Sequence, residues 1–282
     1  MKDLLSNTVI FLLLFVGGLL IGWHFIQEDV ILYFTQLEVN PEEFTQNMEI
    51  SQETAEFDPT VVRSLEAFEW LNYINVDEEL FAVGELLIPS IELNLPIFLG
   101  VAEPNISLGV GTVVSNLVKG EGNYILASHW DPSPRVRFGG LHLVQPGDAL
   151  ILRDSENLFI YETIIGDNYI IAPNRWDIAD VVEGKVYLTL FTCTPDGSER
   201  VMVRGELIEI INIEELRYAI ENDIESPIIQ SELLPIELTT IIEMMDADPH
   251  PFPILPVSAT IGSSGLIAIL VISFSSKPKK SK

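Results

Sequence analysis

The features that decide the fold lie in one stretch of sequence, KVYLTLFTCTPDGSERVMVRGEL (Lys185–Leu207). Its first part is rich in β-branched and aromatic residues and ends at Cys193, and the Pro-Asp-Gly that follows is typical of a turn. An alternating apolar pattern resumes at Arg200. The pattern predicts two strands joined by a turn, with Cys193 at a partly accessible strand end and Arg200 within reach of it.

Similar strand-like runs recur upstream, from Gly84 onward. They are separated by Gly, Pro, Asn and Asp, and they include ELLIP (85–89), NYILAS (123–128), DALILR (148–153), LFIYETI (158–164) and YIIAP (169–173). Short apolar or alternating runs at this spacing are typical of a β-barrel or β-sandwich. The region is therefore expected to form one all-β domain.

Two acidic flanks border the strand-rich region. Residues 28–80 contain 14 carboxylates and a single basic residue, and residues 206–248 contain 12 carboxylates and a single basic residue. With a net charge of −27, the chain lacks the clustered cations that nucleic-acid binding requires. We interpret the flanks as solvated surface and linker. No EF-hand spacing occurs in them, and no metal site is expected.

Within the first flank, residues 57–80 are expected to be helical. Val61, Leu65, Phe68 and Leu71 fall close to one helical face, and glutamates occupy other positions. Asp58, followed by Pro59, would then be the cap at the start of this helix.

The only cysteine, Cys193, excludes an intramolecular disulfide and a multi-cysteine zinc site. A lone cysteine is most often a small buried apolar residue. Its strand-end position and a nearby guanidinium, which favours thiolate and could stabilise an oxyanion, instead indicate a nucleophile. Such a thiol needs a proton shuttle. Of the four histidines, His129 follows a strand-like run and is the best candidate, whereas His142 has the sequence context of a structural or surface residue.

Both ends of the chain contain apolar segments. Val9–Ile26 has no acid or strong base over 18 residues, which is just long enough to cross a bilayer. A cleavable signal peptide is the alternative, but no small-residue cleavage site follows. Near the other end, the apolar Gly265–Phe274 precedes a lysine-rich tail. Two spanning segments would place everything between them outside the cell.

The chain resembles the sortase family, over Gly84–Leu207. The resemblance rests on Gly84-Glu-Leu-Leu-Ile-Pro89, Ala127-Ser128-His129, Pro146-Gly147-Asp148 and Thr189-Leu-Phe-Thr-Cys193 followed by Arg200. It implies a closed eight-stranded β-barrel with the active site at one end, and a cysteine transpeptidase that needs no cofactor. Cys193 would form a thioester with a Leu-Pro-x-Thr-Gly-like sorting signal. His129 would move protons, Arg200 would hold carbonyl oxygens, and Thr192 would contact substrate.

Class C, the pilin-polymerising sortases, is the most similar subgroup. Thr192-Cys193-Thr194-Pro195 and the two apolar ends are similar to that class, as is Asp58-Pro59, where the class carries a lid over the active site. The chain departs from the family at Ser128, where Gly or Ala is usual, and at Trp130-Asp131, where Arg-Gly is usual. The Asp58-Pro59 pair is explained equally well by a lid and by a helix cap.

These inferences divide the chain into an N-terminal anchor (1–27), an acidic helical segment with the lid (28–80), a catalytic barrel (81–210), an acidic linker (211–256) and a C-terminal anchor with a basic tail (257–282). The expected partners are sorted surface proteins or pilins, and an amine acceptor from a pilin lysine or a cell-wall precursor. Three alternatives remain: a general surface-protein sortase, a non-catalytic barrel that binds sorting signals, and a sorted protein whose own tail begins at Leu255-Pro256.

Overall fold

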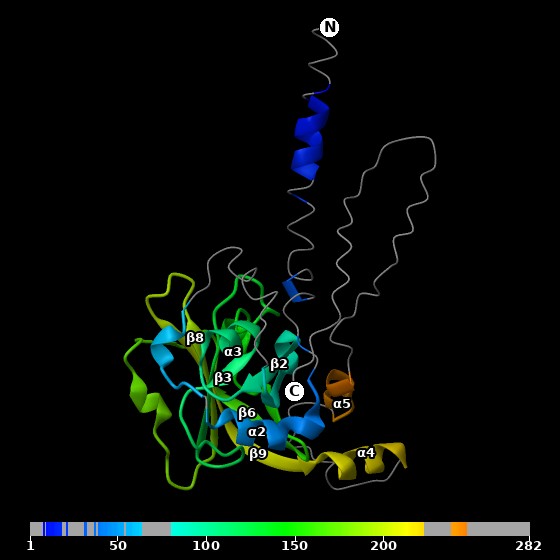
Figure 1. The fold of residues 1–282 in the computed structure, drawn as a ribbon, viewed down its shortest axis with the longest axis vertical. Coiled ribbons are helices and arrows are strands. Elements are labelled where there is room, and N and C mark those ends of the chain that lie inside the picture. The colour runs from blue at the N-terminus through cyan, green and yellow to red at the C-terminus, as the bar shows by residue number, and fades with distance from the viewer. Residues whose placement is uncertain are drawn as a thin grey trace.

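The structure is a computed structural model that describes residues 8, 10–18, 21, 31–32, 37, 39–53, 55–63, 80–222 and 238–246. Strands dominate it between residues 82 and 212 (Figure 1). In chain order they are β1 (Ala82–Ile88), β2 (Leu93–Phe98), β3 (Val110–Thr112), β4 (Asn123–Ala127), β5 (Ala149–Arg153), β6 (Asn157–Ile165), β7 (Ile170–Ile171), β8 (Tyr187–Cys193) and β9 (Arg200–Asn212).

The sheet closes into a barrel of eight strands. Neighbouring strands pair in the order β6-β5-β1-β2-β3-β4-β8-β9, and β6 also pairs with β9, which completes the ring. The short β7 pairs only with the start of β9, beside the ring. Closure leaves no free edge among these eight strands, and this explains why their apolar runs form one continuous core. The predicted closed barrel is confirmed.

Alternate side chains of each strand fill the barrel, as the period-two pattern requires. Leu86, Tyr124, Leu150, Leu188 and Val203 belong to this interior cluster and are at most 1% exposed. Strand residues of the opposite parity point outward, and several of them are covered by helices. The sequence therefore specifies both faces of the sheet.

A partly buried cation lies at the end of the barrel where β4 begins. Lys119, in the loop before β4, donates from Nζ to the carbonyl oxygen of Val83 at 2.8 Å and lies over the ring of Tyr124. Burial lowers the pKa of Lys119 to about 8, and the charge of Asp154 opposes this shift. Since β4 begins near Lys119 and ends before His129, this lysine and His129 lie at opposite ends of that strand.

Two helices after the barrel cover its outer face. α4 (Ile213–Glu221) and α5 (Leu238–Asp246) pack Leu216, Ile241 and Met245 against outward-facing residues of β5 and β6. Arg217 of α4 and Asp246 of α5 form a two-pronged ion pair. The described parts of 211–256 therefore differ from the open linker expected there, because α4 has an apolar face with period 3.6 that the barrel buries.

The segment before the barrel also differs from expectation. In the described part of the first flank, the α-helix α2 (Phe44–Ser51) packs on the barrel through Phe44. In the described part of 57–80, the only helical turn is the 3-10 helix η2 (Pro59–Val61), and Val62 and Arg63 are not helical. The expected helix is therefore wrong for residues 57–63, because the backbone of Val62 and Arg63 bonds to barrel side chains instead. Residues 64–79 lie outside the described residues.

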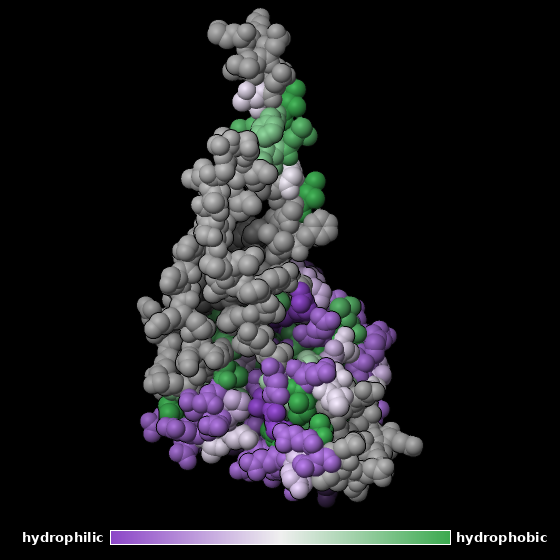
Figure 2. Space-filling model, turned by 90° about the vertical axis from the view of Figure 1, so that its right-hand side faces the viewer, coloured by the Kyte–Doolittle hydropathy of each residue, from purple (hydrophilic) through white to green (hydrophobic). Residues whose placement is uncertain are grey.

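Of the two expected terminal anchors, only the N-terminal one is described, and only in part. Residues 10–18 are helical, and their apolar side chains are exposed, as the green band on the N-terminal helix in Figure 2 shows. Among the residues that the structure describes, no helix has both the length and the hydropathy that a membrane span requires. The expected C-terminal anchor lies outside the described residues.

Candidate functional site

Strand register places the three predicted catalytic residues at one end of the barrel. β4 and β8 are parallel neighbours, and Ala127 pairs with Phe191, so that His129 and Cys193 each follow two residues later at the same edge. β8 and β9 are antiparallel, and Cys193 pairs directly with Arg200 across the turn. The proximity of Cys193 and Arg200 expected from the sequence is therefore present, and the β4–β8 pairing adds His129.

The expectation that Cys193 is partly accessible is wrong for this structure, in which 1% of its surface is exposed, because the backbone of Val62 covers the thiol. Its Sγ donates a hydrogen bond to the carbonyl oxygen of Val62 at 3.1 Å. Burial raises the pKa of the Cys193 thiol, while the positive charges of Arg200 and Arg63 act in the opposite direction. The thiol form is therefore favoured while the site is covered.

The guanidinium of Arg200 contacts the same carbonyl. Its Nη2 lies 3.4 Å from the Val62 oxygen, and its Nη1 donates to the carbonyl oxygen of Glu199. One peptide carbonyl is thus held by the thiol and by the guanidinium together. The site accommodates a peptide bond, and in this structure that bond is the one between Val62 and Arg63 of the same chain.

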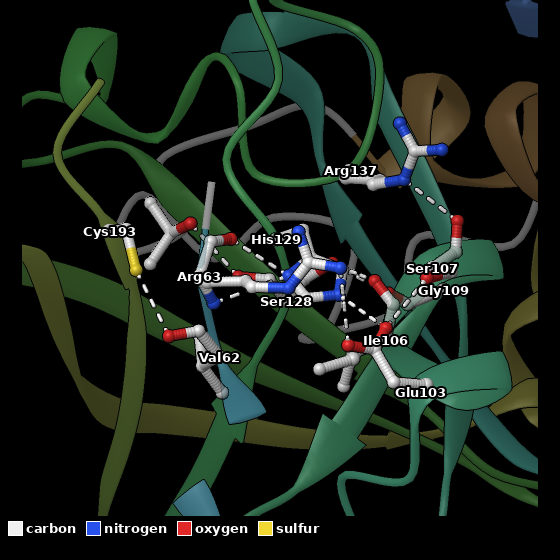
Figure 3. Close-up of polar contacts among 11 residues, drawn as sticks. Val62, Arg63, Glu103, Ile106, Ser107, Gly109, Ser128, His129, Arg137 and Cys193 are labelled. Carbon is white, nitrogen blue, oxygen red and sulfur yellow. Dashed lines mark hydrogen bonds and ion pairs between the residues drawn. The ribbon is translucent and has the colours of Figure 1, made fainter. Parts of the chain in front are cut away.

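His129 is completely buried between two elements (Figure 3). On one side, Nδ1 lies 2.8 Å from the carbonyl oxygen of Arg63, and the Arg63 N–H also points at Nδ1, at 3.3 Å. On the other side, Nε2 lies 3.0 Å from Oε2 of Glu103. The sequence does not identify Val62, Arg63 or Glu103 as residues of the site, because no local pattern marks them.

Residues 55–63 lie against the barrel through several backbone and apolar contacts. The amide of Val101 donates to the carbonyl oxygen of Glu56 at 2.7 Å, beside Gly100, whose φ is +82°. A Cβ at Gly100 would lie 2.5 Å from that same oxygen, so only glycine allows the approach. The side chain of Val62 is 1% exposed and packs into a cluster that includes Val101, Ile106 and Val113.

Asp58 caps the turn that precedes Val62. Its Oδ1 accepts from the amide of Thr60 at 3.0 Å and from the Thr60 hydroxyl at 2.6 Å, and these bonds lower the pKa of the Asp58 carboxyl. Asp58 therefore has the geometry of a cap, on the η2 turn instead of the expected α-helix. The contacts with Cys193 and Arg200 come from Val62, four residues later.

Thr192 is fully buried, and its hydroxyl donates to the carbonyl oxygen of Ser128 at 2.9 Å. The bond joins the end of β8 to the residue that follows β4, so Thr192 links the neighbours of Cys193 and His129. In this structure its hydroxyl is directed at that backbone oxygen. Among the described residues, no group of three or more His, Cys, Asp or Glu side chains is arranged to hold a metal ion.

The fold and this end of the barrel define a class of protein, the cysteine transpeptidases built on an eight-stranded barrel. The family model of the sortase domain matches residues 86–208. The chain is 30% identical to sortase A of Bacillus anthracis over 210 residues, which cover 73% of this chain and 96% of that protein. It is 32% identical to sortase A of Streptococcus agalactiae over 157 residues, covering 54% and 63% of the two chains.

Among solved structures, sortase A of Listeria monocytogenes is similar, with 28% identity, a TM-score of 0.45, and coverage of 51% of this chain and 99% of that one. Sortase C-3 of Streptococcus pneumoniae shares 23% identity, with a TM-score of 0.48 and coverage of 66% and 92%. The chain belongs to the sortase family, and it is a cysteine transpeptidase.

Proposed function

We propose that the chain is a membrane-anchored, extracellular sortase that uses Cys193 to cleave a Leu-Pro-x-Thr-Gly-like sorting signal and joins the acyl part to an amine. The observation that carries this proposal is the carbonyl of Val62, which accepts from both Cys193 Sγ and Arg200 Nη2. A carbonyl held this way is close to a thiol nucleophile and to a cation that can stabilise its oxygen when negative charge develops.

The reaction has two proton-balanced halves. In the first, His129 takes the proton of the Cys193 thiol, the sulfur forms a bond to the scissile carbonyl carbon, the carbon–nitrogen bond breaks, and His129 gives that proton to the leaving amine. In the second, an incoming amine forms the new carbon–nitrogen bond, His129 takes its proton, the carbon–sulfur bond breaks, and the sulfur regains the proton from His129. Arg200 stabilises the oxyanion in both halves.

The segment around Val62 and Arg63 acts as a plug in the resting enzyme. It occupies all three groups, since its backbone contacts Cys193, Arg200 and His129. Substrate must displace it to reach the thiol. The plug is the lid expected near Asp58-Pro59. Its blocking contacts come from the backbone of Val62 and Arg63, and Asp58 caps the turn before them.

For the acceptor, we propose a lysine amine of a pilin subunit, so that the reaction assembles pili. The support is the class C similarity of Thr192-Cys193-Thr194-Pro195 and the apolar segments at both ends of the chain. The second candidate is attachment of surface proteins to a cell-wall precursor. It is favoured by the curated relatives, which are named sortase A.

The test uses the full chain in detergent with a panel of Leu-Pro-x-Thr-Gly-like peptides, each with a lysine peptide or a cell-wall peptide as acceptor. Mass spectrometry identifies the products and any thioester. We expect an acyl adduct on Cys193 and joined peptides, and no product from Cys193→Ala. Product formation by Cys193→Ala would refute the mechanism, and joining only to the cell-wall peptide would refute the pilin acceptor.

A further inference from the structure

Glu103 contacts the ring nitrogen of His129 that faces away from the plug. It opens the short helix α3 (Glu103–Leu108), and its Oε2 lies 3.0 Å from His129 Nε2. The other carboxylate oxygen, Oε1, lies 3.6 Å from the guanidinium of Arg63. The Glu103 side chain is 37% exposed, whereas that of His129 is fully buried. The carboxylate is therefore the group that connects the buried imidazole to the solvent side.

α3 is fastened to the chain on both sides of His129. The Ser128 hydroxyl, in the residue just before it, donates to the carbonyl oxygens of Ile106 and Gly109 at 3.0 and 2.7 Å. In the loop after it, Arg137 donates from Nε to the carbonyl oxygen of Ser107 at 2.7 Å (Figure 3). The position of α3 relative to His129 is thus set by three hydrogen bonds that do not involve Glu103.

A buried ion pair supports the loop after His129. Asp131 pairs with Arg137 at 2.7 Å, and both side chains are at most 6% exposed. The departures from the family at Ser128 and Asp131 therefore belong to one network, which joins both sides of His129 to α3. We propose that this network serves to place Glu103 as a positioning residue for His129. The inference rests on the proposed role of His129 as acid and base.

The geometry assigns different tasks to the two ring nitrogens. A carboxylate and a carbonyl oxygen can only accept, so a ring that bonds both Glu103 and the Arg63 oxygen carries a hydrogen on each nitrogen, and Glu103 holds the one on Nε2 when the ring gives up the other. Nδ1 faces the space that the plug fills, beside the carbonyl that bonds to Cys193 and Arg200. Nδ1 is therefore the nitrogen that gives and takes the proton in the reaction. This is the arrangement of a base oriented by a third group, with the carboxylate also stabilising the imidazolium.

The test measures both ring chemistry and turnover in the full chain. Nitrogen-15 NMR of the imidazole, at a pH where the ring is neutral, reports which nitrogen carries the hydrogen. We expect the Nε2–H tautomer in the wild type and a shift toward Nδ1–H in Glu103→Gln. For turnover, we expect Glu103→Gln to lower kcat about tenfold with KM unchanged, which corresponds to about 1.4 kcal/mol of transition-state stabilisation.

Two matched variants separate the positioning role from other effects. Arg63→Ala breaks the Arg63–Glu103 ion pair but keeps the Glu103–His129 contact, so it should leave the ring in the Nε2–H tautomer. Glu206→Gln removes a half-exposed carboxylate that pairs with Lys185 away from the site, and it should leave both readouts unchanged.

Three results would overturn the inference: equal changes of the ring tautomer in Glu103→Gln and Arg63→Ala, an unchanged kcat in Glu103→Gln, or an Nδ1–H tautomer in the wild type. Absence of Cys193-dependent turnover in the wild type would instead refute the proposed function. In that case the NMR result on the resting enzyme would decide, by itself, whether Glu103 positions His129.

Discussion

Replacing Val62 by alanine should expose Cys193 to solution reagents. Val62 is 1% exposed, and its side chain holds the plug in the apolar cluster with Val101 and Ile106. The change removes two carbon atoms, which costs about 1.6 kcal/mol at about 0.8 kcal/mol per buried CH₂, and a residual cavity brings the cost to about 2 kcal/mol. If this cost falls only on the closed state, the fraction of molecules in which the plug is open should rise about thirtyfold. Opening also restores hydration of the thiol, so its pKa falls and the reactive thiolate increases.

The assay is alkylation of the full chain by a neutral reagent, followed by mass spectrometry. Because Cys193 is the only cysteine, every adduct reports on this site. The matched control is Val113→Ala, since Val113 is 6% exposed in the same cluster but belongs to the barrel and not to the plug. Equal labelling rates in the wild type and Val62→Ala, or equal acceleration in both variants, would refute the plug.

Three further predictions follow from the geometry. Gly100→Ala places a Cβ 2.5 Å from the Glu56 oxygen at a positive φ, so it should displace the plug, accelerate labelling of Cys193 and lower Tm; unchanged labelling would contradict it. Ser128→Ala leaves two buried carbonyl oxygens without their hydroxyl donor and should lower the free energy of unfolding by about 1–3 kcal/mol in chemical denaturation. The pKa of Lys119 is lowered from 10.5 to about 8, so the unfolded state binds more protons between these pH values and stability gains with rising pH there. Lys119→Met should therefore raise the free energy of unfolding more at pH 7 than at pH 10. An equal rise at both pH values would show that the pH dependence of stability does not come from Lys119.

The barrel and the pairing of Cys193 with Arg200 could be predicted because both depend on local patterns. Alternating strands and a Pro-Asp-Gly turn specify an antiparallel pair, whichever fold surrounds it. His129 could be identified by its position at a strand end and by elimination among the other histidines. Its neighbours in space could not be identified in this way.

Glu103 shows why part of the site could not be predicted. It lies 26 positions before His129, in a chain with many glutamates, and only the packing of α3 brings the two together. Val62 and Arg63 were misassigned for a related reason. The apolar spacing of Val61 with Leu65 predicts a helix through these two residues, but tertiary hydrogen bonds to Cys193 and His129 outweigh that local preference.

A plug on the same chain has a consequence for where the enzyme can work. A tethered competitor reaches an effective concentration on the order of millimolar, whatever the dilution of the enzyme. A free peptide at micromolar concentration therefore competes poorly for the site, even when its own contacts match those of Val62 and Arg63. With the membrane anchoring proposed above, a substrate confined to the same surface would itself be concentrated near the enzyme and could compete on equal terms. The plug would thus make turnover depend on crowding of substrate at the surface and keep stray extracellular peptides from being cut.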